Sequence, residues 1–315
     1  MSESFARLIT RRSAIALAGL VPGLLGAGLA QAQTASDGET TGTVPGSADG
    51  SAGHGPDSGS GNRLVGTVDH AANGFDPHAM LTDFDYGTSS RDADGQAVRE
   101  WTITAVDQEI EIAPGVTFPA WTYNGRVPGP TLRCVEGERL RVHFSNAGSH
   151  PHTIHFHGIH SARMDGIDGA GMVEPGGSFT YEFNAEPFGC HLYHCHALPL
   201  KRHSHKGLYG AFIIDPDPDR HPDDRNAALQ RLHTAVEAKR WQEFIIVMNG
   251  FDTNFDDENE FYAANSIAFA YADRPIRIDG SRPVRIYLSN VTEFDPINSL
   301  HLHGNFFNFF DHGTT

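Results

Sequence analysis

The chain has 315 residues, and its 39 acidic and 23 basic side chains give a formal net charge of −16 at pH 7. So acidic a chain has no electrostatic reason to bind nucleic acid or an anionic membrane surface, and we expect neither as a partner. It also contains 19 histidines and 3 cysteines, the residue types that bind transition metals.

The first 32 residues have the composition of an export signal. Arg11-Arg12 precede an apolar run over 14–29, and residues 30–32, Ala-Gln-Ala, offer a small-residue cleavage site. The pattern predicts a twin-arginine signal peptide over 1–32. Ala14 stands where that route favours Phe, so the ordinary secretory route stays open. In either case we expect a periplasmic or secreted protein, because the run is too short and too interrupted by glycine for a membrane span.

Residues 33–62 are rich in Gly, Ser, Asp and Thr without an apolar period, which predicts a disordered linker. The next region, 63–216, alternates apolar and polar residues as half-buried strands do. Examples are Leu140, Val142 and Phe144, then Phe179, Tyr181 and Phe183, and the short run Phe212 to Ile214. Gly and Pro turns separate these strands, and helix signals are sparse. The region is therefore predicted to be an all-β sandwich.

Two histidine motifs in this region have the composition of a metal site. His152 is followed by His155 and His157, and the tripeptide His194-Cys195-His196 is followed by His203. A thiolate beside imidazoles selects copper or zinc over hard cations. Structural zinc usually takes its ligands from closely spaced pairs, and these motifs are interleaved instead. The motifs therefore favour copper.

Strand parity divides these residues between two copper centres. If 191–196 is extended, Cys195 points to one face and its two neighbouring histidines point to the other. His152 has the opposite parity to His155 and can turn toward Cys195. The blue centre would then hold His152, Cys195 and His203, and the second centre would begin with His155, His157, His194 and His196. Cys195 and its flanking histidines would form a covalent electron bridge between the centres.

The two motifs, His-x-x-His-x-His-Gly and His-Cys-His, resemble the last two ligand motifs of the multicopper oxidases, and the likeness runs from about Trp101 to the end of the chain. The resemblance implies cupredoxin-like Greek-key β-sandwiches with type 1, type 2 and type 3 copper. Carried over by motif position, His152, Cys195 and His203 are type 1 ligands, His155 is a type 2 ligand, and His157, His194 and His196 are type 3 ligands.

An internal repeat predicts a second, tandem β-sandwich. Arg-Val-His-Phe-Ser-Asn at 141–146 recurs as Arg-Ile-Tyr-Leu-Ser-Asn at 285–290. We expect the second copy over 242–315, after an interdomain linker over 217–241 that contains an amphipathic stretch. Asn298 stands where the first copy has His152, so no type 1 copper is expected in the second copy. By resemblance, His301 and His303 remain as type 2 and type 3 ligands.

The resemblance also implies a homotrimer. In two-domain members with type 1 copper only in the first domain, each trinuclear cluster lies between the first domain of one chain and the second domain of the next. Only twelve residues follow His303, so we expect the second sandwich to be incomplete and the chain to be a fragment. The remaining type 3 ligands would lie outside it.

These features predict a laccase-like oxidase that passes electrons from a phenol-like or metal-ion donor to O₂ through Cys195, His194 and His196. One alternative is a copper nitrite reductase, a family that carries an aspartate at the position of His155 and a non-ligand at that of His196. The other alternative is a non-catalytic copper-binding electron carrier. The sequence does not identify the donor.

Several residues near the motifs have open roles. Leu208 occupies the position where blue-copper proteins often have an axial Met, which predicts a three-coordinate copper, unless His205 reaches the metal or replaces His203. Asp165 is expected to be a turn residue, with proton delivery as the alternative. Cys134 and Cys190 either pair or stay free. Seven histidines have no partner at metal spacing and are expected to be surface or hydrogen-bonded residues: His143, His150, His160, His191, His221, His233 and His312.

Overall fold

The computed structural model describes residues 64–221, 241–294, 300–307 and 309–311. All of them belong to one compact unit that spans Gly59–Thr315. The predicted signal peptide, the linker over 33–62 and Asn298 lie outside the described residues, as do residues 222–240 of the predicted interdomain linker. Within the described part, no helix is long and apolar enough to cross a membrane.

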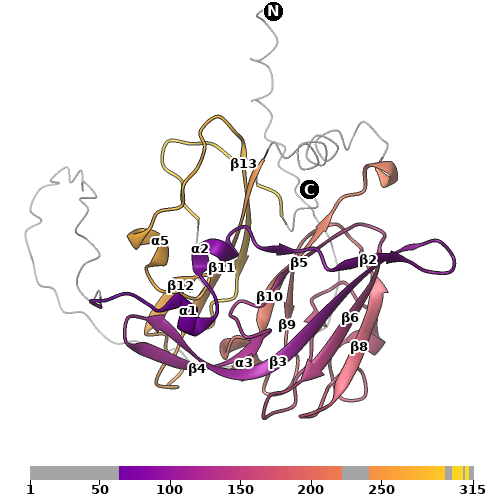
Figure 1. Ribbon diagram of the computed structural model, residues 1–315, viewed down its shortest axis with the longest axis horizontal. Helices are drawn as coiled ribbons and strands as arrows, with labels where there is room; N and C mark the ends of the chain where they lie inside the picture. Colours follow the sequence, from indigo (N-terminus) through magenta and orange to yellow (C-terminus); the bar gives the residue numbers. More distant parts are fainter. Residues whose placement is uncertain (1–63, 222–240, 295–299, 308, 312–315) are drawn as a thin grey trace, which may run out of the picture. The chain divides into compact units, whose positions relative to one another are not determined.

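Two mixed sheets build the first part of the unit (Figure 1). One sheet has the order β1-β5-β10-β9-β7, formed by Phe84–Asp85, Thr131–Val135, Tyr209–Asp215, Gly189–His194 and His155–Phe156. The other has the order β2-β3-β6-β8 with β4 paired to β3, formed by Thr88–Arg91, Ala97–Ala113, Arg139–Asn146, Ser178–Asn184 and Val116–Tyr123. The described helices are short: α1 (His70–Asn73), α2 (Pro77–Met80), α3 (Leu200–His205), α5 (Ala270–Asp273) and the 3-10 turns Ala162–Met164 and Pro218–Arg220.

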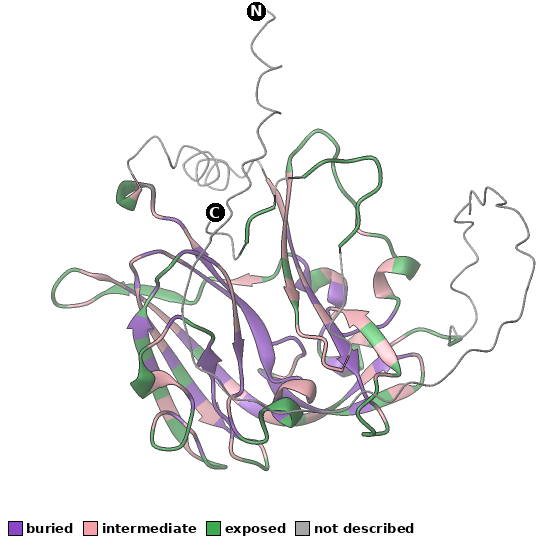
Figure 2. Cartoon of the chain, turned by 180° about the vertical axis from the view of Figure 1, so that it is seen from behind, coloured by how far each residue is buried: buried purple, intermediate pink, exposed green. Residues whose placement is uncertain are grey.

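The main hydrophobic core lies between these two sheets. In β6, Leu140, Val142 and Phe144 are buried while the residues between them are not, so the predicted alternation is confirmed. They share one buried cluster with Leu132 of β5 and Phe212 of β10. Figure 2 shows buried residues concentrated on the strands and exposed ones in the connecting loops. Each fully buried side chain of this kind contributes about 1.5–3 kcal/mol to folding, and together they hold the loops that carry the histidine motifs.

A third sheet repeats part of the first arrangement. Its order is β12-β11-β13, formed by Phe261–Ala264, Gln242–Phe251 and Val284–Asn290. β13 runs parallel to β11 and β12 runs antiparallel to it, as β6 and β4 do to β3. The repeated sequence is therefore also a repeated pattern of strand pairing. The domain limits 63–216 and 242–315 stay predictions.

The two copies differ in how well their repeated strands are buried. Val284 and Ile286 of β13 are only half-buried and Leu288 is 38% exposed. The predicted alternation is thus weaker in β13 than in β6. The opposite face is better covered, since Tyr287 packs against a second core cluster that contains Ile245.

Candidate metal centre

The first group of candidate ligands joins three separate segments. His152 precedes β7, Cys195 follows β9, and His203 lies on α3. The His203 Nδ1 lies 3.3 Å from the Cys195 Sγ and 3.3 Å from the His152 Nδ1. The three ligand atoms lie within 4.8 Å of one another, and all three residues are buried. The structure thus brings together the three predicted type 1 ligands.

The chemistry of this group fits copper. Burial lowers the pKa of both His152 and His203 to about 4, so at neutral pH each imidazole is uncharged and offers a nitrogen lone pair. Burial also raises the pKa of the Cys195 thiol. A thiolate without a counter-charge is unfavourable at such a site, and a bound cation supplies that charge. One soft thiolate with two neutral imidazoles is the donor set that selects copper.

The backbone around Cys195 departs from the predicted strand. β9 ends at His194, because the His196 amide donates to the Thr153 hydroxyl at 2.7 Å instead of continuing the ladder. The same hydroxyl lies 3.7 Å from the Cys195 Sγ. Thr153 therefore positions both the thiolate and the residue after it. Our sequence analysis missed this residue, and the only signal for it was its place beside His152.

The second group lies where β7 pairs with β9. His155 is opposite His194 in this pairing, and the His157 Nδ1 lies 3.2 Å from the His194 Nε2. Ligand atoms of His155, His157 and His194 lie within 4.8 Å of one another. The His196 ring lies beside that of His155, with 4.3 Å between the centroids, but it is not part of this three-residue group. Three of the four predicted ligands therefore converge directly, and the fourth is adjacent.

Asp165 and His160 lie behind the second group. The Asp165 carbonyl accepts hydrogen bonds from the Nδ1 atoms of His155, at 2.8 Å, and His196, at 3.2 Å. The His160 Nε2 lies 3.0 Å from the same His155 Nδ1, and the His160 side chain is only 5% exposed. His155, His160 and Asp165 have ligand atoms within metal-binding distance of one another. The expectation that His160 has no partner at metal spacing was wrong, because the turn after His157 folds back onto His155. Asp165 does lie in a turn, as predicted.

The two groups are joined through the backbone at Cys195. The His194 Nδ1 donates to the Cys195 carbonyl at 2.9 Å, which leaves the His194 Nε2 directed at the second group. Burial lowers the pKa of His194 to about 4, so this imidazole is also neutral. The sulfur of one group and a ligand nitrogen of the other thus belong to consecutive residues.

The structure distinguishes His203 from His205. Both residues lie on the helix α3. In a helix, side chains two residues apart point in different directions. In the strand assumed from the sequence, the two side chains would point to the same face. The His205 Nε2 accepts a hydrogen bond from the Asp252 amide at 3.1 Å, while His203 faces Cys195. Leu208 is fully buried in the same core cluster as Cys195. Its axial position stays a prediction.

His301 and His303 lie side by side, with their ring centroids 4.6 Å apart. Both are exposed, and within the described residues neither belongs to the two groups above. Their assignment as copper ligands stays a prediction.

The remaining cysteines are free thiols. β10 pairs with the strand of Cys134 on one side and with the strand of Cys190 on the other. Two strand spacings, about 9.5 Å, separate such positions, and a disulfide needs Cα atoms within about 7 Å. The disulfide alternative was therefore wrong.

The other histidines with expected non-metal roles divide into two sets. Those that the structure describes hydrogen-bond to protein groups, as expected: His143, His150, His191 and His221. His233 and His312 lie outside the described residues.

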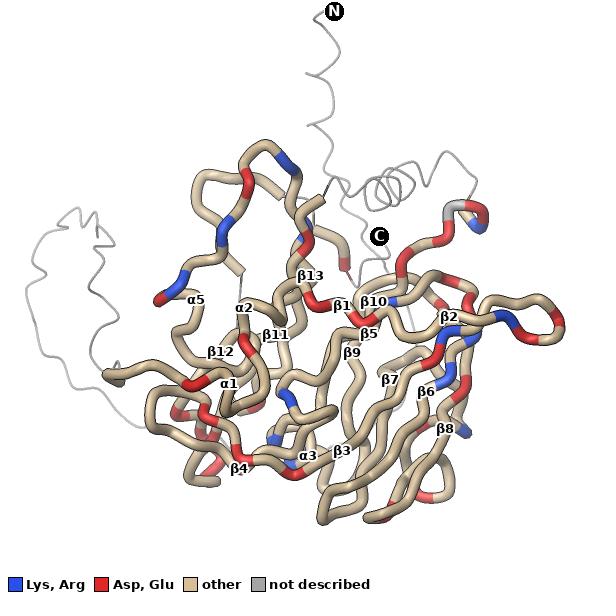
Figure 3. Tube along the Cα trace, in the orientation of Figure 1, with Lys and Arg blue, Asp and Glu red and all other residues tan. Residues whose placement is uncertain are grey.

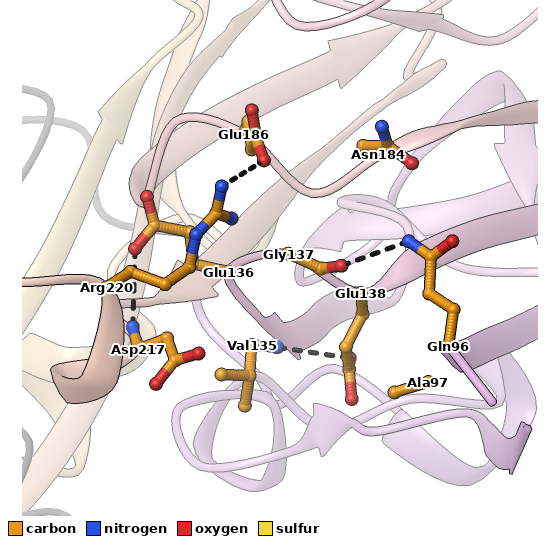
Figure 4. Close-up of a pocket in the computed structure, with 10 residues that line it drawn as sticks. All are labelled: Gln96, Ala97, Val135, Glu136, Gly137, Glu138, Asn184, Glu186, Asp217 and Arg220. Carbon is orange, nitrogen blue, oxygen red and sulfur yellow. Dashed lines mark hydrogen bonds and ion pairs between the residues drawn. The ribbon is translucent and has the colours of Figure 1, made fainter.

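A surface pocket of about 580 Å³ shares no lining residue with either ligand group (Figure 4). Its walls include four acidic residues, Glu136, Glu138, Glu186 and Asp217, and Arg220 donates a hydrogen bond to Glu186. It contains none of the candidate ligands. The metal chemistry therefore does not use this pocket.

Comparison with known proteins places these features in a family. A model of the multicopper oxidase family matches residues 104–219. A crystal structure of a multicopper oxidase is 51% identical, with a TM-score of 0.70, over 79% of this chain and 82% of that chain. The copper-containing nitrite reductase of Neisseria meningitidis is 26% identical over 205 residues, 64% of this chain and 52% of that protein. The copper resistance protein A homolog of Pseudomonas syringae pv. tomato is 33% identical over 131 residues, 40% of this chain and 22% of that protein.

The chain belongs to the multicopper oxidase family, and copper is the metal that this family implies. The predicted cupredoxin-like β-sandwich fold is confirmed by the 51% identical structure. The chain spans about half the length of the nitrite reductase that it matches.

Proposed function

We propose that the full-length protein is a laccase-like oxidase that couples the one-electron oxidation of a phenol-like or metal-ion donor to the reduction of O₂. The observation that carries this proposal is the convergence of His155, His157 and His194 next to Cys195. The copper nitrite reductase family, which this chain also resembles, carries an aspartate at the position of His155 and a non-ligand at the position of His196. Two histidines at these positions favour a multi-copper cluster instead.

The chain's own residues would hold the metal and carry the electrons. His152, Cys195 and His203 would bind type 1 copper, and His155, His157, His194 and His196 would bind part of the trinuclear cluster. Bound copper supplies one-electron redox chemistry. Cys195 and its flanking histidines provide a short covalent path, and the burial of Cys195 keeps bulk water from the thiolate. Four donor oxidations supply the four electrons that, with four protons, convert O₂ to two waters.

Metal analysis of the full-length protein, combined with an oxygen-uptake assay, tests this function. An oxidase would contain about four copper ions per chain, a nitrite reductase about two and an electron carrier about one. The nitrite reductase is the second candidate because of the 205-residue match to such an enzyme. Nitrite reduction without oxygen uptake would overturn the oxidase, and copper binding without either activity would leave the carrier.

We also propose that the protein is exported to the periplasm or beyond, on the sequence of residues 1–32. Replacing Arg11 and Arg12 by lysine should retain the precursor in the cytoplasm if the twin-arginine route is used. Immunoblotting of cell fractions checks this. Normal export of the variant would indicate the ordinary secretory route.

The proposed assembly is a homotrimer in which His301 and His303 complete a neighbouring chain's cluster. It rests on the repeat and on Asn298, which lacks an imidazole where type 1 copper would need one. Sedimentation of the full-length protein measures the number of chains directly.

A further inference from the structure

Trp121 lies between the first ligand group and the surface. It belongs to β4, and its ring centroid lies 4.8 Å from that of His203 and 5.1 Å from that of His152. The ring of His150, an exposed residue, lies 4.6 Å from the same indole. Trp121 itself is only 6% exposed. An aromatic contact therefore connects the exposed His150 to both buried imidazoles.

Two cations lie over this indole. The Arg202 guanidinium carbon and the Lys206 ammonium each lie 5.6 Å from the Trp121 ring centroid. Within the described residues, neither side chain has a carboxylate at ion-pair distance, whereas the neighbouring Lys201 approaches Glu293 at 3.9 Å. Arg202 is exposed. Lys206, in contrast, is only 7% exposed, and a buried ammonium with ring contacts but no paired carboxylate is a favourable place for an anion to bind.

An exposed aromatic ring adjoins these cations. The Lys206 ammonium lies 4.9 Å from the ring centroid of Phe255, which is 56% exposed. Burial lowers the pKa of Lys206, and the carboxylate of Asp107, which lies beyond ion-pair distance, opposes that shift. Figure 3 shows acidic residues spread widely over the strands and loops, in keeping with the net charge of −16. Unpaired positive charge beside aromatic rings is thus a local feature of this site.

We propose that Trp121, His150, Arg202, Lys206 and Phe255 form a donor-binding surface that selects aromatic electron donors carrying a negative charge. The proposal rests on the proposed function, since it names the class of donor that this oxidase would use. The ring of the donor would contact Phe255 and His150, and its anionic group would pair with Arg202 and Lys206. A bound phenol would lose one electron and one proton to become a phenoxyl radical. The proton would pass to solvent water, and the electron would pass toward His203 to reduce type 1 copper.

Three phenols of similar ring chemistry test the selectivity on the copper-loaded, full-length protein. They are 4-hydroxyphenylacetate, 4-methylphenol and tyramine, which carry a negative, no and a positive charge. We expect kcat/KM to be highest for the anion and lowest for the cation. In Arg202→Gln and Lys206→Gln proteins, the ratio of kcat/KM for 4-hydroxyphenylacetate to that for 4-methylphenol should fall about 3- to 10-fold. The matched control, Lys201→Gln, removes the same charge from the same helix and should keep the ratio.

A second measurement separates this proposal from the proposed function. Without oxygen, each phenol should bleach the blue absorption, and the bleaching rate should follow the same charge order and weaken with added salt. Retained blue colour establishes that each variant is folded and loaded. If this preference is present while oxygen uptake fails with every donor, the donor surface stands and the oxidase function falls. Equal ratios in all three variants and the parent protein, or an equal fall in Lys201→Gln, would overturn the donor surface.

Discussion

The backbone carbonyl of Asp165 accepts hydrogen bonds from two candidate ligands, His155 and His196. Because each uses its Nδ1 in this contact, each keeps its Nε2 lone pair for a metal. One turn residue thus sets the tautomer and the ring orientation of both side chains. The sequence cannot reveal such a role, since every residue has a carbonyl and only the turn directs this one.

At Cys195, serine would keep the volume of the side chain but would not supply a thiolate. We expect Cys195→Ser to lose the intense blue absorption and to reduce oxidase activity to background, because the colour arises from thiolate-to-copper charge transfer. Visible absorption and oxygen uptake measure both effects, and circular dichroism verifies the fold. A blue, active variant would exclude Cys195 as the ligand.

Leu208 offers no lone pair to copper. A thioether at this position would donate weakly to copper and favour the oxidised form, so Leu208→Met should lower the type 1 potential by on the order of tens of millivolts. Redox titration of both proteins provides the measurement, and Leu208→Ile is a control that keeps an apolar side chain. If the potential stays the same or rises in Leu208→Met, this residue is not axial.

Acid should destabilise the copper-free protein between about pH 6.5 and pH 4. Burial lowers the pKa of His152, His194 and His203 to about 4 in the folded state, while the unfolded chain titrates near pH 6.5. As the pH falls through this window, the unfolded chain takes up protons that the folded chain does not. Each histidine's contribution to the free energy of unfolding is therefore lost. The loss should approach about 3 kcal/mol per histidine.

Urea unfolding of the copper-free protein at pH 7 and pH 5 measures this effect. A His203→Gln protein, which lacks one of the three groups, should lose less stability between the two values. Equal losses in the two proteins would mean that His203 titrates normally in the folded state.

At the scale of the elements, Arg133 connects the first sandwich to the third sheet. It lies on β5 with a fully buried side chain, and it bonds to Asp215 of β10 at 2.7 Å and Glu243 of β11 at 3.1 Å. These carboxylates raise the pKa of the guanidinium against the effect of burial, so it stays charged. Arg285 of β13 also pairs with Glu243. Four strands therefore share one ionic network.

Removing the central cation should destabilise the fold strongly. Arg133→Met leaves two largely buried carboxylates near each other, and we expect a loss of about 3 kcal/mol in the free energy of unfolding, the low end for a broken buried pair because Arg285 remains. The control Arg141→Met removes a partly exposed partner of Glu182 and Glu100 and should change little. Urea denaturation compares the two. Similar small losses would show that the Arg133 network contributes no more than a surface pair.

Sequence patterns predicted the elements best where burial alternates. The alternation in β6 and the parity of Cys195 against His194 both follow from the two-residue period of a strand, and both agree with the structure. The helix that carries His203 was missed, because its six residues are too few for a helical period to be visible. His160 and Trp121 were also missed as neighbours of the ligands. Their contacts depend on how segments distant in the sequence pack together, which no local pattern encodes.

At the scale of the whole molecule, the candidate ligands do not form one set. The ligand atoms of His155 on β7, His157 just after β7 and His194 on β9 converge. His301 and His303, in contrast, lie together in the predicted second copy. The repeat predicts the second copy, and the resemblance supplies the arrangement in which one chain's second domain meets the next chain's first. If that arrangement holds, a defect in either domain can be complemented by another chain.

Mixed rings test this arrangement. Full-length His301→Ala/His303→Ala chains and Cys195→Ser chains should each be inactive alone, since every interface of a uniform ring then lacks one part. After denaturation and joint refolding with copper, a mixed ring contains an interface at which an intact first domain faces an intact second domain. Some oxygen uptake should therefore return. For random mixing of equal amounts of the two chains, we expect about a quarter of the parent activity or less. Mixed trimers identified by mass that take up no oxygen would contradict the shared interface, and the cluster would then have to form within one chain.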